Sequence, residues 1–234
     1  MCIQAKISRY RMLKIAFCGL LFGVGYYYMF GTQTLSVTKS TTANIARRTI
    51  MSSINNTVAL GAGCYWGTEK FVKKDFEKRF PGSVASGQVG FMSPDPNAKA
   101  NPTYREVCSG VTGYVEVLNV ELSDPAQHFE ELVRFFFMFH DPTTEDRQGN
   151  DVGTQYASVI FTNGEEQKRI ATKVAAELQD HIDAKKIKRY ANPKVMTKIV
   201  AANTFVAAHA EHQAYLEKNP GGYCNHFYRF KEWP

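Results

Sequence analysis

Short apolar strands and amphipathic helices alternate from Thr57 onward, and this alternation restricts the possible folds more than any other feature of the sequence. Val58-Ala59-Leu60 is typical of a short buried strand, and the glycine-rich turn after it leads into a helix that begins near Cys64. Apolar side chains recur at intervals of four residues along that helix, and Pro81-Gly82 ends it. Strands and helices that alternate in one compact unit predict a two-layer α/β sandwich.

The same patterns predict the other elements. Strands are expected at 83–89, 114–122, 156–161 and 195–200, and helices at 127–140, after residue 163 and at 207–216. Asn163 and Glu166 together resemble a capping box at the start of the second of these helices. We therefore predict an α+β fold, with a mixed sheet and a ferredoxin-like core.

The positive charge of the chain is concentrated at its N-terminus. The 234 residues include 28 Lys and Arg and 22 Asp and Glu, a net charge of +6. Seven of the basic residues lie in residues 1–50, and no acidic residue precedes Glu69, so residues 51–234 carry 21 basic and 22 acidic residues. We see no basic stripe there beyond the residues between 185 and 189, which we interpret as a solvated helix end or loop. We therefore predict no nucleic-acid partner.

Residues 1–50 have the composition of a leader. Basic residues precede an apolar run at 15–30, and an acid-free stretch follows it up to Arg47-Arg48. The run is shorter than the about 20 residues of a spanning helix, so a secretory signal, a signal anchor and a mitochondrial presequence all remain open. The lack of acid favours a mitochondrial address, whereas a second start at Met51 would give a cytoplasmic form. We expect membrane contact only through residues 15–30.

Cys64 is the candidate nucleophile. It follows the glycine-rich turn and opens a helix, where free N–H groups and the helix dipole favour a thiolate, so we expect a lowered thiol pKa. Gly61 and Gly63 allow the tight turn and the close approach of a substrate. A small buried hydrophobic residue is the alternative. The aromatic pair Tyr65-Trp66 that follows favours the reactive thiol.

The residues around Cys64, Gly63-Cys64-Tyr65-Trp66-Gly67-Thr68-Glu69, resemble the nucleophile motif of the methionine sulfoxide reductase A family, the peptide-methionine (S)-S-oxide reductases. Four further blocks of that family follow in order, at 102–110, 140–144, 148–156 and 218–224. The resemblance implies an enzyme without cofactor or metal that reduces the S-epimer of methionine sulfoxide, free or in oxidised proteins, to methionine. It also implies a sulfenic acid and an intramolecular disulfide as intermediates.

The resemblance implies that Cys64 attacks the sulfoxide sulfur and that Glu116 supplies a proton to the oxygen. Glu116 shares one face of its predicted strand with apolar residues, and an apolar setting raises a carboxyl pKa. Taken alone, it would be interpreted as a strand-edge carboxylate facing water. Tyr104 and Tyr156 match the tyrosines that donate hydrogen bonds to the sulfoxide oxygen, although either alone would more often be a packed aromatic.

Three more residues match substrate-binding positions of the family. Tyr65 and Trp66 would form the apolar wall that receives the substrate methyl group. Family members commonly have Phe at the first position, so the Tyr here adds a hydroxyl to the pocket. Asp151 matches an aspartate that helps to anchor substrate, and taken alone it would be an ordinary loop carboxylate.

Cys224 matches the resolving cysteine of the family. A second thiol can condense with a sulfenic acid to form a disulfide, and the Gly-Gly-containing tail gives Cys224 mobility. Many relatives carry a further C-terminal cysteine, and none follows Cys224 in this sequence. We therefore expect the Cys64–Cys224 disulfide to be reduced directly by thioredoxin. Cys108 is expected to be structural, and Cys2 and Cys18 belong to the leader.

Two other functions are weighed against this one. A cysteine hydrolase would need a histidine base near the thiol, and no histidine falls in a supporting motif. A thiol redox sensor or membrane-tethered interaction domain would form the same disulfide without turnover. His209 and His212 lie three apart on a predicted helix, but too few other ligands accompany them for a metal site. The family implies a monomer.

Overall fold

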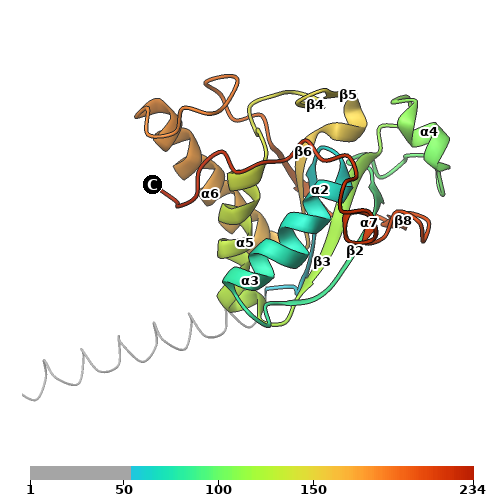
Figure 1. Ribbon diagram of the computed structural model, residues 1–234, viewed down its shortest axis with the longest axis horizontal. Coiled ribbons are helices and arrows are strands. Elements are labelled where there is room, and N and C mark those ends of the chain that lie inside the picture. The colour runs from blue at the N-terminus through green and yellow to red at the C-terminus, as the bar shows by residue number, and fades with distance from the viewer. Residues whose placement is uncertain (1–53) are drawn as a thin grey trace, which may run out of the picture. The chain divides into compact units, whose positions relative to one another are not determined.

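The computed structural model describes residues 54–234, and the leader predicted at 1–50 lies outside the described residues. A six-stranded sheet in the order β7-β6-β1-β3-β2-β8 forms the centre of this part of the chain (Figure 1). Its strands are β1 (Thr57–Ala62), β2 (Val84–Met92), β3 (Val115–Leu122), β6 (Ser158–Thr162), β7 (Lys198–Ala201) and β8 (Val206–Ala207). Neighbouring strands are antiparallel except β6 and β7, which are parallel. The predicted mixed sheet is therefore confirmed.

Three long helical segments pack against this sheet. The first is continuous, with a π-helical middle, and consists of α2 (Tyr65–Lys70), η1 (Phe71–Phe76) and α3 (Glu77–Arg79). The others are α5 (Pro125–Phe139) and α6 (Glu165–Asp183). Helix α5 begins where the sequence places a cap and a proline, because the Asp124 side chain accepts a hydrogen bond from the Gln127 N–H.

The shorter elements lie around the ends of the strands. They are α4 (Tyr104–Cys108), the hairpin of β4 (Arg147–Gln148) and β5 (Asp151–Val152), the 3₁₀ turn η2 (Thr154–Tyr156) and α7 (Tyr215–Lys218). Among residues 54–234, no helix is long and apolar enough to cross a membrane.

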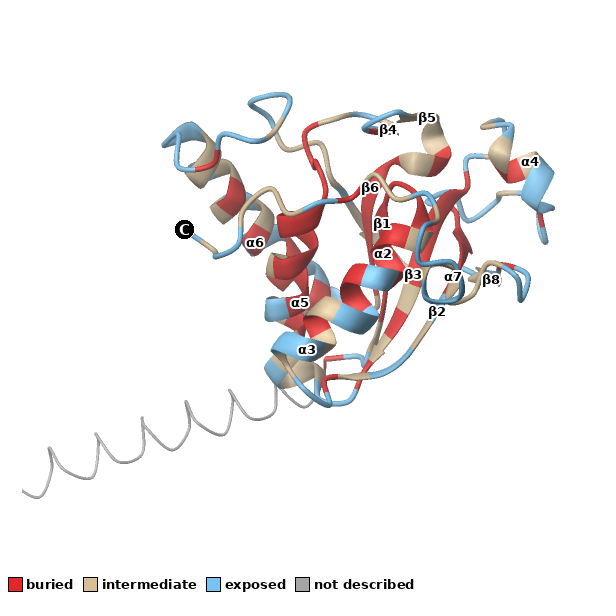
Figure 2. Cartoon of the chain, viewed as in Figure 1, coloured by how far each residue is buried: buried red, intermediate tan, exposed pale blue. Residues whose placement is uncertain are grey.

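The two faces of the sheet carry different apolar clusters. Val58 and Leu60 belong to the large cluster that includes the helices, whereas Ala59 between them belongs to a smaller cluster on the other face. This alternation is the two-residue period of a strand. Figure 2 shows the buried positions of α2 and α5 beside the strands. Leu118 and Val120 of β3 lie in the large cluster, so the residues that share a face with Glu116 point toward the helices.

Two details of the predicted elements are wrong. The helix expected at 207–216 is confined to α7, because the chain first adds β8 to the sheet edge and Ala214 then takes a left-handed conformation with φ 53°. The capping box expected at Asn163 does not form. The N-cap of α6 is Gly164, and the Asn163 amide instead donates to the Thr57 carbonyl oxygen in β1.

Candidate active site

Cys64 lies at the junction of β1 and α2, as the N-cap of the helix, and its side chain is buried with 8% of its surface exposed. The turn before it requires glycine. Gly63 has φ +91°, and a Cβ there would lie 2.5 Å from the Gln148 side chain. The sequence therefore places the thiol in a turn that is tightly enclosed by the β4–β5 hairpin.

The C-terminal tail covers the same turn through His226. The His226 Nε2 lies 2.7 Å from the Ala62 carbonyl oxygen, so this nitrogen donates the hydrogen bond. The His226 ring packs directly against Gly67 of α2, where a Cβ would lie 2.0 Å from Nδ1, so this position has no room for a side chain. Burial lowers the pKa of His226 to about 4, which keeps the imidazole neutral.

Glu116 lies on β3 against the start of α2, with only 3% of its surface exposed. Its Oε2 accepts a hydrogen bond of 3.1 Å from the Tyr65 N–H. Burial raises the pKa of Glu116 to about 8 and the charge of Asp151 adds to the rise, while the Tyr65 N–H opposes it. The carboxyl therefore keeps its proton near neutral pH.

The expectation of a lowered Cys64 pKa is wrong for this structure. Burial raises the pKa of the thiol well above its ordinary value, and the charge of Glu116 raises it further. The N–H groups of Trp66 and Gly67 act in the opposite direction, as a helix start should, but their effect is smaller than the loss of hydration. The free site therefore holds a thiol rather than a thiolate.

Two tyrosines from short elements lie near the Glu116 carboxyl. Tyr104 begins α4 and Tyr156 ends η2, and the charge of Glu116 contributes to raising the pKa of both phenols, after burial. After burial, the Cys108 side chain one turn later on α4 also raises the pKa of the Tyr104 phenol. Since Glu116 also raises the pKa of Cys108, this cysteine, expected to be structural, borders the site.

The aromatic pair after Cys64 divides between the core and the surface. Tyr65 is buried, with its ring centroid 5.7 Å from that of Phe91. The half-buried Trp66 stacks on Tyr215 of α7, with centroids 3.7 Å apart, and also on His212. His212, half of the alternative metal pair, thus packs in an aromatic cluster.

Asp151 connects the site to the tail that carries Cys224. The Tyr223 hydroxyl donates to Asp151 Oδ1 at 2.9 Å, and the Asn225 amide donates to Oδ2 at 2.7 Å. Both partners are the immediate neighbours of Cys224. The Cys64, Cys108 and Cys224 side chains are all free thiols in this structure. The residue expected to anchor substrate therefore also fixes the tail.

The structure thus gathers Cys64, Glu116 and the predicted substrate-binding residues around the start of α2, with Cys224 on the tail that covers it. Sequence reasoning missed four contacts of this site, which are Gln148, His212, Asn225 and His226. Asn225 and His226 directly follow Cys224, and this proximity was the available signal. Gln148 and His212 act through side-chain contacts across the fold, for which the sequence has no periodic signal.

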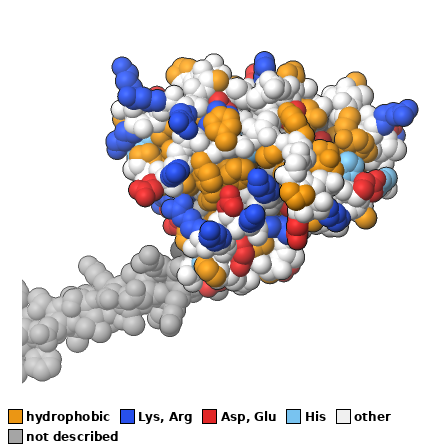
Figure 3. All heavy atoms as spheres, viewed as in Figure 1, with side chains coloured by type: hydrophobic (Ala, Val, Ile, Leu, Met, Phe, Trp, Pro, Cys, Tyr) orange, Lys and Arg blue, Asp and Glu red, His pale blue; other side chains and the backbone are white. Residues whose placement is uncertain are grey.

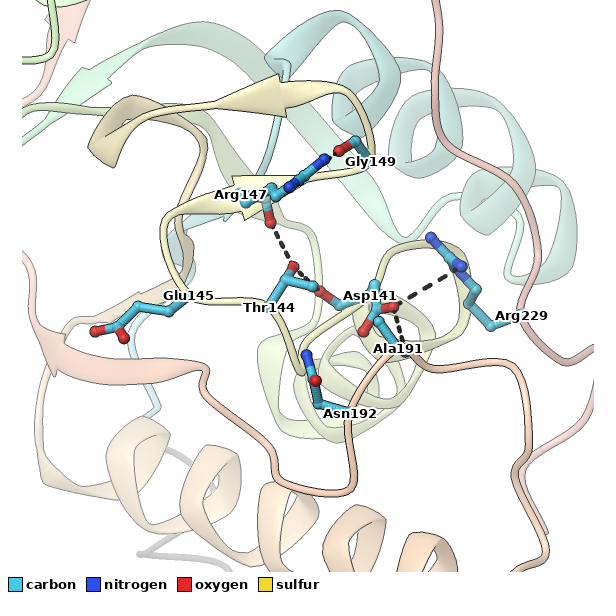
Figure 4. A pocket seen from close by; sticks show the side chains of 8 residues that line it. All are labelled: Asp141, Thr144, Glu145, Arg147, Gly149, Ala191, Asn192 and Arg229. Carbon is cyan, nitrogen blue, oxygen red and sulfur yellow. Dashed lines mark hydrogen bonds and ion pairs between the residues drawn. The ribbon is translucent and has the colours of Figure 1, made fainter.

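A hollow with a volume of about 520 Å³ lies beside the β4–β5 hairpin (Figure 4). Asp141 and Arg229 line it and face each other at 3.9 Å, and none of the predicted site residues lines it. The Asp141 carboxylate also accepts hydrogen bonds from the N–H groups of Thr143 and Ala191. This hollow is the outer side of a charge-paired structural cluster.

A thiol at a helix start, beside a protonated carboxyl and two phenols, is the set of groups expected of a thiol-based oxidoreductase. Comparison with known proteins defines the class further. The family model described as "Peptide methionine sulfoxide reductase" matches residues 56–232. The chain belongs to this family and is a peptide methionine sulfoxide reductase, an oxidoreductase that acts on methionine sulfoxide.

Individual relatives agree with this assignment. A probable peptide methionine sulfoxide reductase of Schizosaccharomyces pombe is 39% identical over 173 residues, which cover 73% of this chain and 95% of the relative. The peptide methionine sulfoxide reductase MsrA of Methanothermobacter thermautotrophicus is 40% identical over 164 residues, covering 70% and 88%. Among solved structures, reduced Mxr1 from Saccharomyces cerevisiae has a TM-score of 0.65 at 32% identity, covering 76% of this chain and 94% of that one. Methionine sulfoxide reductase A of Corynebacterium diphtheriae has a TM-score of 0.58 at 38% identity, covering 72% and 77%.

Proposed function

We propose that this reductase is specific for the S-epimer of methionine sulfoxide, free or within oxidised proteins, and that it works through Cys64, Glu116 and Cys224. The observation that carries this proposal is the Glu116 carboxyl, which is buried, lies at the start of α2 and has its pKa raised to about 8. A sulfoxide oxygen leaves sulfur only after it is polarised and protonated. A carboxyl that is still protonated at neutral pH is the group needed for this task.

In the first step the Cys64 sulfur attacks the sulfoxide sulfur and the Glu116 proton passes to the sulfoxide oxygen. Tyr104 and Tyr156, both near Glu116, donate hydrogen bonds to that oxygen. The sulfur–oxygen bond then breaks. The bond between the two sulfur atoms breaks as the oxygen, with its proton, passes to the Cys64 sulfur, so that Cys64 becomes a sulfenic acid and methionine is released. The proton of the thiol replaces the one that Glu116 has given.

In the second step the Cys224 thiol attacks the Cys64 sulfenic acid, so that a disulfide forms and water leaves. A dithiol reductant, which we propose to be thioredoxin, returns both cysteines to thiols. No further cofactor takes part in this sequence. The contacts of Tyr223 and Asn225 with Asp151 hold the tail before the reaction, so we propose that they loosen when Cys224 moves to Cys64.

A turnover assay on resolved S and R epimers tests the proposal. Wild type should reduce the S-epimer over many turnovers, and Cys64→Ser should be inactive. Cys224→Ser should complete about one turnover per enzyme with thioredoxin, because the sulfenic acid lacks its resolving thiol. Full thioredoxin-dependent activity of Cys224→Ser would show that another cysteine resolves. Absence of turnover by wild type would favour the sensor.

The structure offers little support for the alternative cysteine hydrolase. His226 lies against Gly67 of α2, but it donates Nε2–H to the Ala62 carbonyl oxygen, and burial lowers its pKa to about 4. A ring held in this way is a poor general base for Cys64. An assay of peptide and ester hydrolysis with wild type would detect this activity directly.

We also infer a ferredoxin-like core. The order β6-β1-β3-β2, with helices after β1 and β3, supports it, since this is the β-α-β-β-α-β arrangement of that fold. Residues 51–234 are proposed to form the catalytic domain, acting as a monomer. For residues 1–50 we propose a mitochondrial address, with a cytoplasmic form from Met51 or a membrane anchor as alternatives. Imaging separate fusions of 1–50 and 51–234 tests this, and a diffuse signal from the first would exclude targeting.

A further inference from the structure

A groove of about 820 Å³ runs along the outer side of the α2–η1–α3 segment and is closed on its other side by α7. Trp66 lines the groove and also belongs to the candidate active site, so the groove adjoins the site at this residue. Figure 3 shows Lys and Arg side chains gathered over this part of the molecule, with acidic side chains between them. The groove therefore leads outward from the position where a methionine sulfoxide side chain would enter.

The lysines of this groove form a stripe that was not recognised in the sequence. Lys70, Lys74 and Lys78 are exposed and line the groove at intervals of four residues. Within residues 54–234 none of these three forms an ion pair or a side-chain hydrogen bond. The basic cluster at 185–189 lies outside the groove. Three uncommitted ammonium groups therefore face a hollow beside the site.

The glutamates of the groove compensate this charge only in part. Glu69 is buried, pairs with Lys73 at 3.3 Å and accepts from the Ala214 N–H. Glu77 accepts hydrogen bonds from backbone N–H groups after α3, which lower its pKa. Only Glu217 of α7 lines the groove without such a partner among the described residues. The charge available to a ligand is thus positive along the helix.

The spacing of the lysines matches an extended peptide. Residues four apart on an α-helix are separated by about 6 Å along the axis, and the π-helical middle of this segment makes the separation of successive lysines slightly smaller. Alternate residues of an extended chain are separated by about 6.6 Å. Acidic side chains at every second position of a peptide would therefore meet successive lysines. With the sulfoxide beside Trp66, the first such position lies about two residues from the methionine sulfoxide and the next about four.

We propose that this groove binds the segment of an oxidised protein that flanks the methionine sulfoxide, and that it selects acidic residues two and four positions away. This inference rests on the proposed function and names a substrate class for the same site. The groove gives a reason why substrates with the same reacting group should differ in rate. The interaction should weaken with salt, because the lysines are exposed.

Capped peptides with one S-methionine sulfoxide test the proposal, with dithiothreitol as reductant. One series carries Asp or Glu two and four residues before the sulfoxide and another carries them after it. Asn or Gln replaces the acids in the matched peptides. At low salt, wild type should prefer the acidic peptide by about 3- to 10-fold in kcat/KM in one of the two series. Equal rates in both series would overturn the proposal. No turnover of even the neutral peptide would instead overturn the proposed function.

Variants then locate the preference. Lys70→Glu with Lys74→Glu should abolish it, and the milder Lys70→Gln with Lys74→Gln should reduce it, while turnover of free methionine sulfoxide stays within about twofold of wild type. Glu217→Gln should strengthen it. The matched control is Lys186→Glu with Lys188→Glu, which changes the net charge equally outside the groove. An equal loss in this control, or a loss only of the thioredoxin-dependent rate, would overturn the assignment of the groove to substrate.

Discussion

Glu116 and Asp141 are both buried carboxyl groups, with 3% and 4% of their surfaces exposed, but their surroundings differ. Asp141 accepts hydrogen bonds from Thr143 and Ala191 and faces the Arg229 guanidinium. Among residues 54–234, Glu116 accepts a single hydrogen bond, from the Tyr65 N–H, and its charged neighbour is another acid, Asp151. Buried charges are normally paired, and an unpaired one keeps its proton instead.

These surroundings give the two residues different roles. Asp141 is suited to holding the structure together, whereas Glu116 is suited to donating a proton. Asp141 is surrounded by donors, so its burial fixes the loop that follows α5. Glu116 is surrounded by apolar residues of β3 and by the thiol, so its burial raises its pKa to about 8. Near neutral pH this environment costs stability, because the carboxyl would lose its proton in the unfolded chain, so removing the carboxyl should not destabilise the fold. We therefore expect changes at Glu116 to affect mainly turnover, and changes around Asp141 to affect mainly stability.

The largest expected effect follows from Glu116→Gln. Turnover of the S-epimer should fall on the order of 10²–10⁴-fold, the usual range for loss of a general acid. Wild-type kcat should decline above about pH 8, as the carboxyl loses its proton, and the variant should lack this decline. A pH series of initial rates measures both. Turnover near the wild-type level would remove Glu116 from the reaction.

Glu116→Gln should lower turnover but raise the stability of the fold at high pH. The folded state raises the pKa of Glu116, so its contribution to stability is complete below the ordinary carboxyl pKa and is lost as the pH rises through about 8. Glu116→Gln should therefore be more stable than wild type at pH 9. The difference should shrink toward pH 5, and urea unfolding at both pH values would show it.

Breaking the pair of Asp141 and Arg229 should lower stability and leave turnover nearly unchanged. Arg229→Met leaves Asp141 without its cation, and removing one partner of a buried pair costs about 3 kcal/mol. The kcat of the folded variant should stay within about twofold of wild type, because Cys64, Glu116 and Cys224 do not line that hollow and the Arg229 side chain reaches the site only through a long hydrogen bond of 3.4 Å to Gln148. Urea unfolding and an assay at 15 °C would separate the two effects. A loss of kcat with unchanged stability would make the hollow part of the active site.

The sequence was sufficient for elements whose own residues determine them. The strand at 114–122 alternates with period two, and the turn before Cys64 needs its glycines, so β3 and the position of the thiol could be predicted. The mixed sheet followed from the order of these segments. Helix α4 also has a local signal, the capping box of Thr103 and Glu106, which was not used to predict it. The two-residue strands of the β4–β5 hairpin are too short to show a period, so their sequence indicates a loop.

The electrostatics of the site could not be predicted in the same way. A helix start lowers a thiol pKa, and this local effect of Trp66 and Gly67 is present. Whether desolvation exceeds it depends on how deeply Cys64 is covered, which is decided by Gln148 and His226 from distant parts of the chain. A sequence gives the sign of each local contribution, whereas the fold decides their sum.

The smallest expected effect tests whether a buried polar group without a hydrogen-bond partner at the site must take part in the reaction. The Tyr65 hydroxyl is buried and has no hydrogen-bond partner among residues 54–234, yet the resemblance to the family, where Phe is common at this position, gives it no role. Tyr65→Phe should keep kcat/KM within about threefold of wild type. It should also be more stable by about 1 kcal/mol, because an unsatisfied buried hydroxyl is removed without creating a cavity. Thermal unfolding and the epimer assay measure these outcomes. A loss of activity comparable to that of Glu116→Gln would instead show that the hydroxyl contacts the substrate. The Glu116 carboxyl and the Tyr65 hydroxyl would then both take part in the reaction.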